Sequence, residues 1–370
     1  MNPHIPFEAS KEVVAVIGQL GRTEDVVFSP SNRRMAIAGF RANRIAVFDI
    51  SVAGANGTFD VSLPRVVELD APFLNEPHGI CFLGENMLAV ANRTGLVHLI
   101  DAPLSGSPHD KRSVASRMTI AGSGHALVHT PGSVAAIAID ADSFELMVCN
   151  NYVNHVTRHI VHMGEDIKVT ADELAIEAGL DVPDGISHSP DGRWIAVSNH
   201  NTHSVFVYAR TPALNRISAP DAVLRNVLCP HGVRFTPDGR FILVADASAP
   251  YVNVYKRGQG DWHGTYDPYS LFPVMEPAVF ASGRHNPQEG GPKGIDLDKN
   301  MTVLVATCES QTLAFFDLAQ VLSRRRAPDN RHKRYVQWRL ENALHRRHPD
   351  VYGRLMHAQA PARTRLEESA

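Results

Sequence analysis

The stretch Pro-His-Gly-Val-Arg-Phe-Thr-Pro-Asp-Gly-Arg-Phe-Ile-Leu-Val-Ala-Asp occupies residues 230–246, and an imperfect copy of it occupies residues 183–199. Four further copies are weaker or divergent, and they begin at or near Glu24, Pro77, Ser133 and Pro292. The copies recur at intervals of roughly 50 residues, which is a period typical of units that stack against copies of themselves. The repeat therefore decides the fold, because each unit can bury its apolar face only against a neighbouring unit.

Each unit has the pattern of four short antiparallel strands. In the copy at 230–246, apolar runs are separated by Pro-Asp-Gly-Arg, where proline fixes φ and glycine accepts a positive φ, as a tight turn requires. A further apolar run precedes each next copy, and these runs lie at 66–69, 118–120, 174–176, 223–224 and 278–280. Four-stranded units at this period predict an all-β fold, a six-bladed β-propeller.

The two ends of the chain complete this picture. Nothing strand-like clearly follows residues 312–317 in the last unit, whereas Val-Val-Ala-Val-Ile at 13–17 precedes the first unit. We therefore expect an N-terminal strand at 13–17 to close the ring, which removes a free sheet edge. The propeller is expected to span residues 1–320.

Residues 321–370 are expected to form a basic, partly helical C-terminal tail. From residue 324 onward the chain has twelve Lys or Arg residues against five Asp or Glu. The segment 335–348 has apolar residues at helical spacing, and such a helix would cap the ring, contact a second copy of the chain or bind a protein partner. One short basic segment gives little support for nucleic-acid binding.

The composition is that of a globular protein with a large core, 44% hydrophobic and 20% charged. No apolar run approaches the length of a membrane span, and the first residues lack the pattern of a secretory signal. The four cysteines are spread singly, which argues against a disulfide framework and a structural zinc site. A cytoplasmic location is expected.

The residue directly before the repeated glycine changes from copy to copy. In four copies it is a reactive side chain, namely His78, Asp184, His231 and Lys293, and the divergent first copy has Glu24 at the corresponding position, before Asp25. The innermost strand of each propeller blade lines the central channel, so these side chains are expected to converge there. The end of the second strand reaches the same face, where it would contribute Asn92, Asn150 or Asn151, Asn199, Asp246, and Cys308 or Glu309.

Carboxylates and imidazoles gathered in this way predict a divalent-cation site. The candidate ligands are Glu24, His78, Asp184 and His231. Oxygen-rich sets suit Ca²⁺, Mg²⁺ or Mn²⁺, and two or three histidines shift the preference toward Zn²⁺, Fe²⁺ or Ni²⁺. In the alternative interpretation, Asn and Asp at strand ends bind only the turn backbone, and a histidine before glycine satisfies a buried carbonyl.

Candidate catalytic residues are Asp246, His231 and Lys293. Lys293 would hold an anionic substrate or form an ion pair with Glu24 across the ring. Five further histidines fall in loops assignable to the same face, and these are His125, His129, His155, His200 and His203. A pocket lined by histidines can also transfer protons near neutral pH without a metal.

The repeats resemble the propellers of the gluconolactonase/regucalcin and YVTN-type lactonase superfamily. The resemblance covers roughly residues 24–317, and its motifs are Asp-Gly-Ile at 184–186 with Ser-Pro-Asp-Gly at 189–192, and His-Gly-Val at 231–233 with Pro-Asp-Gly at 237–239. In the gluconolactonase branch, a first-blade Glu and an Asn and an Asp that precede such glycines hold a divalent cation. By position these correspond to Glu24 and Asp184, whereas the third unit offers only Ser133, Ala135 or Ala136 for the Asn.

His78, His231 and Lys293 depart from that pattern, and His-Gly at such positions is more similar to lyases on related propellers. The resemblance therefore implies a metal-dependent, lactonase-like hydrolase that acts on a small molecule at the central channel. One alternative is a lyase or isomerase that uses the same ring to abstract a proton. Another is a non-catalytic scaffold that binds a partner through its rim loops and tail.

Overall fold

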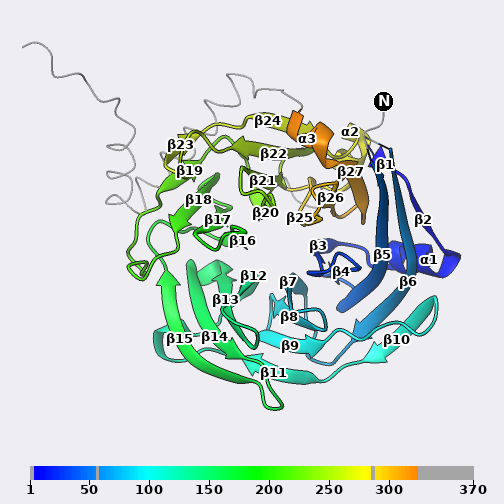
Figure 1. Ribbon diagram of the computed structural model, residues 1–370, viewed down its shortest axis with the longest axis horizontal. Helices are drawn as coiled ribbons and strands as arrows, with labels where there is room; N and C mark the ends of the chain where they lie inside the picture. The colour runs from blue at the N-terminus through cyan, green and yellow to red at the C-terminus, as the bar shows by residue number, and fades with distance from the viewer. Residues whose placement is uncertain (1–3, 56–57, 285–287, 324–370) are drawn as a thin grey trace, which may run out of the picture.

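The computed structural model describes residues 4–55, 58–284 and 288–323, and six small β-sheets surround one axis (Figure 1). The predicted six-bladed β-propeller is therefore confirmed. The innermost strand of each blade, in chain order, is β3 (Thr23–Phe28), β7 (Pro77–Leu83), β12 (Pro131–Ala138), β16 (Pro183–His188), β20 (Pro230–Phe235) or β25 (Ile295–Leu297).

Three more strands follow outward in each blade. The second strands are β4 (Arg34–Gly39), β8 (Met87–Asn92), β13 (Ser143–Asn150), β17 (Trp194–Asn199), β21 (Phe241–Asp246) and β26 (Val303–Ala306). The third strands are β5 (Arg44–Ala55), β9 (Val97–Asp101), β14 (His155–His162), β18 (Ser204–Ala209), β22 (Tyr251–Lys256) and β27 (Ala314–Asp317). The fourth strands of the first five blades are β6 (Thr58–Asp70), β11 (Ser116–Ile120), β15 (Lys168–Ile176), β19 (Ala222–Leu224) and β24 (Ser270–Pro273).

The ring is closed by an N-terminal strand, as predicted, but not by the segment expected. β1 (His4–Ile5) pairs antiparallel with β27 and completes the sixth blade. The prediction of a strand at 13–17 is wrong, because these residues lie in helix α1 (Lys11–Gln19). Ser10 caps this helix by accepting a hydrogen bond from the Val13 backbone N–H, and the helical spacing of Val13, Val16 and Leu20 places all three in the core.

A second expected strand is also a helix. Residues 278–280 lie in α2 (Pro277–Ser282), which starts at a proline that suits the first helical turn, and β24 is the outer strand instead. Beyond the last blade strand, α3 (Leu318–Ser323) buries Leu318 and Val321 against the fifth and sixth blades. The helix predicted at 335–348 lies outside the described residues.

Short segments cover several outer edges. β2 (Phe7–Ala9) and β10 (His109–Ser113) both pair in parallel with β6, and β23 (Gly264–Tyr266) pairs in parallel with β19 of the preceding blade. Such pairing occupies edge groups that would otherwise be free to pair with another chain. No helix in the described ranges is long and apolar enough to cross a membrane.

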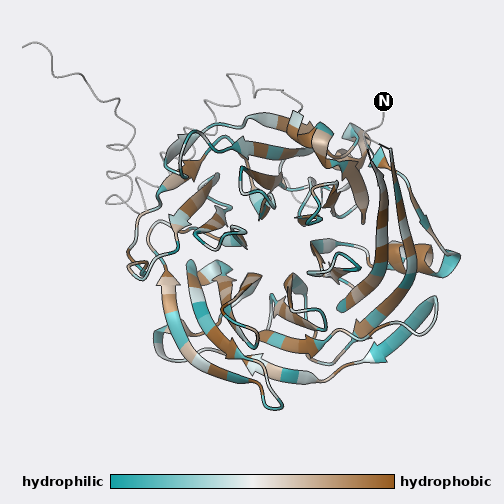
Figure 2. Cartoon of the chain, in the orientation of Figure 1, coloured by the Kyte–Doolittle hydropathy of each residue, from teal (hydrophilic) through white to brown (hydrophobic). Residues whose placement is uncertain are grey.

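The core of the described part of the chain is divided among the interfaces between blades. Each of six hydrophobic clusters joins the facing surfaces of two consecutive blades, and one of them joins the sixth blade to the first. Apolar residues accordingly run along the blade strands, whereas the exposed strand β10 is hydrophilic (Figure 2). Every blade is thus stabilised by burial against both of its neighbours.

The repeated glycine marks the closest approach of one blade to the next. A Cβ atom at Gly232 would lie 2.6 Å from the carbonyl oxygen of Lys293, and one at Gly294 would lie 2.6 Å from the Cα of Asp25. At Gly185 it would overlap the carbonyl oxygen of His231. The glycine is therefore required because the backbone next in the ring, at or beside its own reactive residue, occupies that space.

Substitution of this glycine should weaken the ring without touching a reactive side chain. We expect Gly232→Ala to lower the free energy of unfolding by about 1–3 kcal/mol, because the new methyl group forces the backbones of the fifth and sixth blades apart. Gly258→Ala is the matched control, since a Cβ there meets no atom within 4 Å. Denaturant unfolding of both variants measures the difference, and equal stabilities would contradict the proposed contact.

Candidate functional site

The reactive residue of each repeat sits at an irregularity in the pairing of the first and second strands. The register skips one residue between Thr23 and Asp25, and equivalent shifts occur at the start of β7, β12, β16 and β20. The skipped residue is Glu24, His78, Gly132 or Asp184 in the first four blades, and the longer break in the fifth blade contains His231 and Gly232. A β-bulge re-aims the side chain of the extra residue, so these side chains leave the blade interfaces and face the axis.

Four of these side chains form one contact group, which we call the axial cluster: Glu24, His78, Asp184 and His231. The Nε2 atom of His231 lies 3.2 Å from Glu24 Oε2 and 3.2 Å from Asp184 Oδ2. His78 Nε2 lies 3.5 Å from Glu24 Oε2 and 3.9 Å from Asp184 Oδ1. The two imidazole rings stack with centroids 5.2 Å apart, and all four residues are buried.

The tautomer of His78 follows from its surroundings. Its Nδ1 lies 2.6 Å from the carbonyl oxygen of Gly132, so Nδ1–H is the donor and the lone pair of Nε2 faces the cluster. Burial and the Arg93 guanidinium lower the pKa of His78 to about 3, so the ring is neutral near pH 7. A neutral imidazole held by a backbone carbonyl in this way is oriented as metal-binding histidines are.

Both carboxyl groups of the cluster are ionised. Burial by itself would raise the pKa of Glu24, but Lys293 and the other surrounding cationic or hydrogen-bonding groups hold it well below its usual range. The pKa of Asp184 is likewise lowered, since His231, His78 and Arg93 outweigh its burial. Lys293 Nζ lies 3.2 Å from Glu24 Oε2, so the predicted ion pair across the ring is present.

One oxygen of the cluster is incompletely satisfied. Glu24 Oε2 has three nitrogen atoms within 3.5 Å, yet none of them meets hydrogen-bond geometry, and no described residue supplies another partner. The other oxygen, Oε1, accepts a hydrogen bond from Arg22. A buried carboxylate oxygen without a hydrogen bond is costly, and it marks a place where a ligand would be stabilised. Glu24, His78 and His231 could hold a metal ion.

Several contacting residues were not singled out in the sequence. Arg93 donates to His78 Nε2 and, over 3.2 Å, to Asp184 Oδ1, and Asn151 donates to the same Asp184 oxygen. His200 Nδ1 lies 3.9 Å from Asp184 Oδ2, and Glu289 binds Lys293 with an oxygen–nitrogen distance of 2.9 Å. Asn151 and His200 were considered among larger sets, whereas Arg22, Arg93 and Glu289 were missed.

A positional rule would have found three of them. Arg93, Asn151 and His200 each directly follow the asparagine that ends the second strand of their blade. Their backbone N–H groups all donate to the residue that precedes the Pro of the inner strand, namely Glu76, Thr130 and Val182. The reactive positions on this face are therefore the residue before the glycine and the residue after the strand-ending asparagine.

The strand-ending residues themselves bind the backbone, as the alternative interpretation predicted. The Oδ1 atoms of Asn92, Asn150 and Asn199 accept from the backbone N–H of Asn75, His129 and Asp181 at 2.7 to 3.0 Å. Asp246 does the same, since its oxygens accept from the backbone of Leu228, Cys229 and Ser248. These contacts account for the burial of Asp246, and its catalytic role stays a prediction.

The third blade contributes differently from what the sequence suggested. Its reactive position is Gly132, not Ser133, Ala135 or Ala136, and a Cβ atom there would overlap the carboxamide of Asn151. Asn151 therefore fills the place that a side chain from the third inner strand would take. In the sixth blade, Glu309 faces Arg41 at 3.4 Å and Arg22 at 3.8 Å, so Glu309 and not Cys308 carries the charge there.

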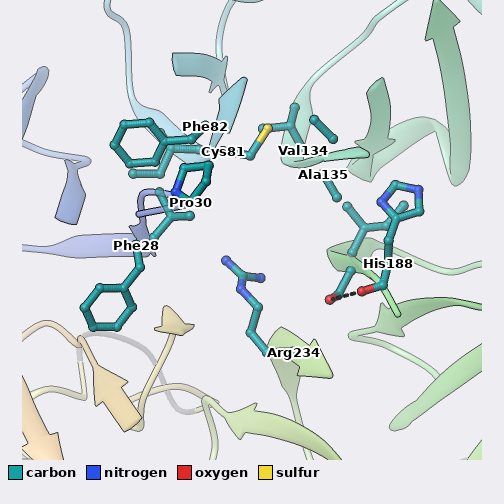
Figure 3. A pocket seen from close by; sticks show the side chains of 13 residues that line it. Phe28, Pro30, Cys81, Phe82, Val134, Ala135, His188 and Arg234 are labelled. Atoms are coloured by element: carbon teal, nitrogen blue, oxygen red, sulfur yellow. Dashed lines mark hydrogen bonds between the residues drawn. The ribbon is translucent and has the colours of Figure 1, made fainter. Parts of the chain in front are cut away.

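The opposite end of the axis, where the inner strands finish, has a cavity of about 230 Å³ with largely apolar walls and one arginine. Figure 3 shows side chains that line it, among them Phe28, Pro30, Cys81, Phe82, Val134 and Arg234. Arg234 binds Asp296 Oδ1 and Asp25 Oδ1, both at 3.1 Å. Burial raises the pKa of both aspartates against the effect of Arg234. None of the axial-cluster residues lines this cavity.

Comparison with known proteins supports the fold alone. No model of a known protein family matches the chain, and no curated protein matches it in sequence. A functionally unknown protein from Desulfotomaculum acetoxidans DSM 771 is similar in structure, with 13% identity, a TM-score of 0.50, and 80% of this chain and 83% of that chain covered. A "putative 6-phosphogluconolactonase" from Bacteroides uniformis ATCC 8492 has 15% identity and a TM-score of 0.46 over 79% and 80% of the two chains.

The buried pairs of Arg234 should be essential for stability. Arg234→Met leaves Asp25 and Asp296 without their cation, and we expect it to lower the free energy of unfolding by about 3–5 kcal/mol. Arg240→Met removes an exposed pair with Asp238 in the same blade and should cost less than about 1 kcal/mol. Thermal and denaturant unfolding test the contrast, and similar losses in the two variants would contradict it.

Proposed function

We propose that the protein is a metal-dependent, lactonase-like hydrolase whose axial cluster binds one divalent ion. The observation that carries the proposal is the contact of the His78 and His231 imidazole nitrogens with Glu24 Oε2, an oxygen of an ionised carboxylate that lacks a hydrogen bond, while His231 also contacts the ionised Asp184. The resemblance of the repeats to lactonase propellers supports the hydrolase class. Glu24, His78, Asp184 and His231 would be the ligands.

The residues present fit such an ion. Around a tetrahedral metal with ligand distances of about 2.0–2.1 Å, neighbouring ligand atoms lie about 3.4 Å apart. Three nitrogen–oxygen separations in the cluster are 3.2, 3.2 and 3.5 Å, and the ligand atoms of Glu24, His78 and His231 all lie within 4.8 Å of one another. Asp184 is outside that group of three, so it would have to move to become the fourth ligand. Two imidazoles favour Zn²⁺ over Mn²⁺, Mg²⁺ or Ca²⁺ among the ions considered.

The mechanism that we infer divides the work among the side chains. When bound, the ion supplies Lewis acidity toward a substrate carbonyl and lowers the pKa of a water molecule. The Gly132 carbonyl fixes the tautomer that leaves His78 Nε2 free as a ligand, and Asn151 orients Asp184 through a hydrogen bond.

Proton transfer requires a base and a donor beside the cluster. Burial lowers the pKa of His200, and its Nδ1 has no hydrogen-bond partner among the described residues, so it can accept the proton of an attacking water. Glu24 and Glu289 raise the pKa of Lys293 against its burial, which keeps Nζ an ammonium able to donate toward an oxyanion. In lactone hydrolysis, water oxygen bonds to the carbonyl carbon, the ring C–O bond breaks and a hydroxy acid leaves.

Metal binding can be tested without knowledge of the substrate. We expect elemental analysis of the purified protein, with or without added Zn²⁺ or Mn²⁺, to find about one divalent ion per chain. Glu24→Gln and His231→Ala should each weaken that ion's binding by at least about 100-fold, because each removes a ligand. His98→Ala serves as control, since His98 stacks on Phe73 outside the cluster.

The same variants connect binding to catalysis. A panel of small lactones assayed with the metal-loaded protein should reveal hydrolysis that chelation abolishes and that Glu24→Gln lacks. Failure to load any ion, with turnover unaffected by either ligand substitution, would overturn the metalloenzyme proposal.

A further inference from the structure

Arg93 occupies the atoms that a metal ion would need. Its Nη2 donates to His78 Nε2 and to Asp184 Oδ1, and both atoms belong to the proposed ligand set. The other two cations beside the cluster behave differently. Lys293 contacts a Glu24 oxygen, and Arg22 binds the opposite oxygen of that carboxylate, so neither contacts an imidazole nitrogen at a hydrogen-bonding distance.

This contact is incompatible with metal binding at His78. With Nδ1–H donating to Gly132, Nε2 has one lone pair, which cannot serve an N–H donor and a metal at the same time. A carboxylate oxygen has more than one lone pair, so Lys293 can keep its contact with Glu24. An ion that enters the cluster must therefore displace the guanidinium of Arg93.

The displaced guanidinium would stay at the same face. The backbone N–H of Arg93 donates to the carbonyl of Glu76 at 3.0 Å, which holds the main chain while the side chain rearranges. The guanidinium lies 5.4 Å from the ring centroid of Tyr152, a residue that is 65% exposed. This cation–π contact can hold the released guanidinium beside the cluster, on its solvent side.

The charge balance then calls for an anion. Among the described residues, the ion pairs at the site join four carboxylates, Glu24, Asp184, Glu289 and Glu309, to four cations, Arg22, Arg41, Arg93 and Lys293. These eight charges cancel, so a divalent ion leaves an excess of two positive charges. Arg93 also loses its contact with Asp184, which leaves its guanidinium free to pair with a new oxyanion.

We propose that Arg93 is a displaceable cap on the metal site that binds an oxyanion group of the substrate once the ion has displaced it. The inference rests on the proposed function, and it assigns the substrate to small molecules that carry a carboxylate or a phosphate. Arg93 is thus a specificity-determining residue, since a guanidinium matches the geometry of these groups.

The first test measures metal affinity. We use the ion that the wild type binds in elemental analysis and titrate it calorimetrically into the metal-free full-length protein. Arg93→Gln should bind the ion about tenfold more tightly than the wild type, because the ion no longer displaces a charged hydrogen-bond donor. Arg22→Gln removes the same charge beside the same cluster without uncovering a nitrogen ligand, so its gain should be clearly smaller.

The second test measures the anion. Inorganic phosphate titrated into the metal-loaded proteins should bind about tenfold more weakly to Arg93→Gln than to the wild type, whereas Arg22→Gln should be affected less. Thermal unfolding checks that each variant is folded.

The outcomes separate the two proposals. An ion that binds Arg93→Gln no more tightly than the wild type overturns the cap while the metal site stands. Tighter ion binding with unchanged phosphate affinity overturns the substrate class. If neither the wild type nor Arg93→Gln binds an ion, the proposed function itself fails.

Discussion

The close contact between consecutive inner strands is the constraint on which the rest of this molecule depends. In four of the six blades the inner strand approaches the next so closely that Gly79, Gly185, Gly232 and Gly294 leave no room for a Cβ atom. The backbone that fills this space belongs to the reactive position of the neighbouring repeat or to the residue beside it. The contacts that close the ring therefore also bring the axial cluster together, because a side chain at the reactive position of a repeat faces the axis.

This coupling explains how much could be predicted from the sequence. The glycine and the turn recur along the chain, so the blade number and the convergence of Glu24, His78, Asp184 and His231 followed from the repeat. Segments outside the repeat were less certain. The largely β-branched run at 13–17 reads as a strand, but the Ser10 cap and the packing of Val13 and Val16 in the core favour a helix.

The missed site residues have a different cause. Glu289 lies in a connecting segment, where no periodicity indicates which way a side chain points, whereas the rule that finds Arg93 emerges only once the ends of the second strands are known. In the third blade the sequence offered Ser133, Ala135 or Ala136, but the position is held by Gly132 and its space is occupied by Asn151 from the adjacent strand end. Whether a side chain from one backbone position fills the space of another depends on distances in three dimensions. An alignment of the repeats within the chain does not contain those distances.

Two consecutive residues show how one strand serves both stability and chemistry. Asp25 is fully engaged: its oxygens accept from the backbone of Val26 and Ile80 and from Arg234, which ties the first, second and fifth blades together. Glu24, one residue earlier, has Arg22 on one oxygen and no hydrogen bond on the other. Both carboxyl groups are buried and both have cations nearby, so burial and charge alone do not distinguish them. The unused hydrogen-bonding capacity does, because a structural carboxylate has all of its partners supplied by the fold. Glu24 Oε2, which has the Lys293 ammonium 3.2 Å away but no hydrogen bond, therefore keeps a capacity for a ligand that Asp25 lacks.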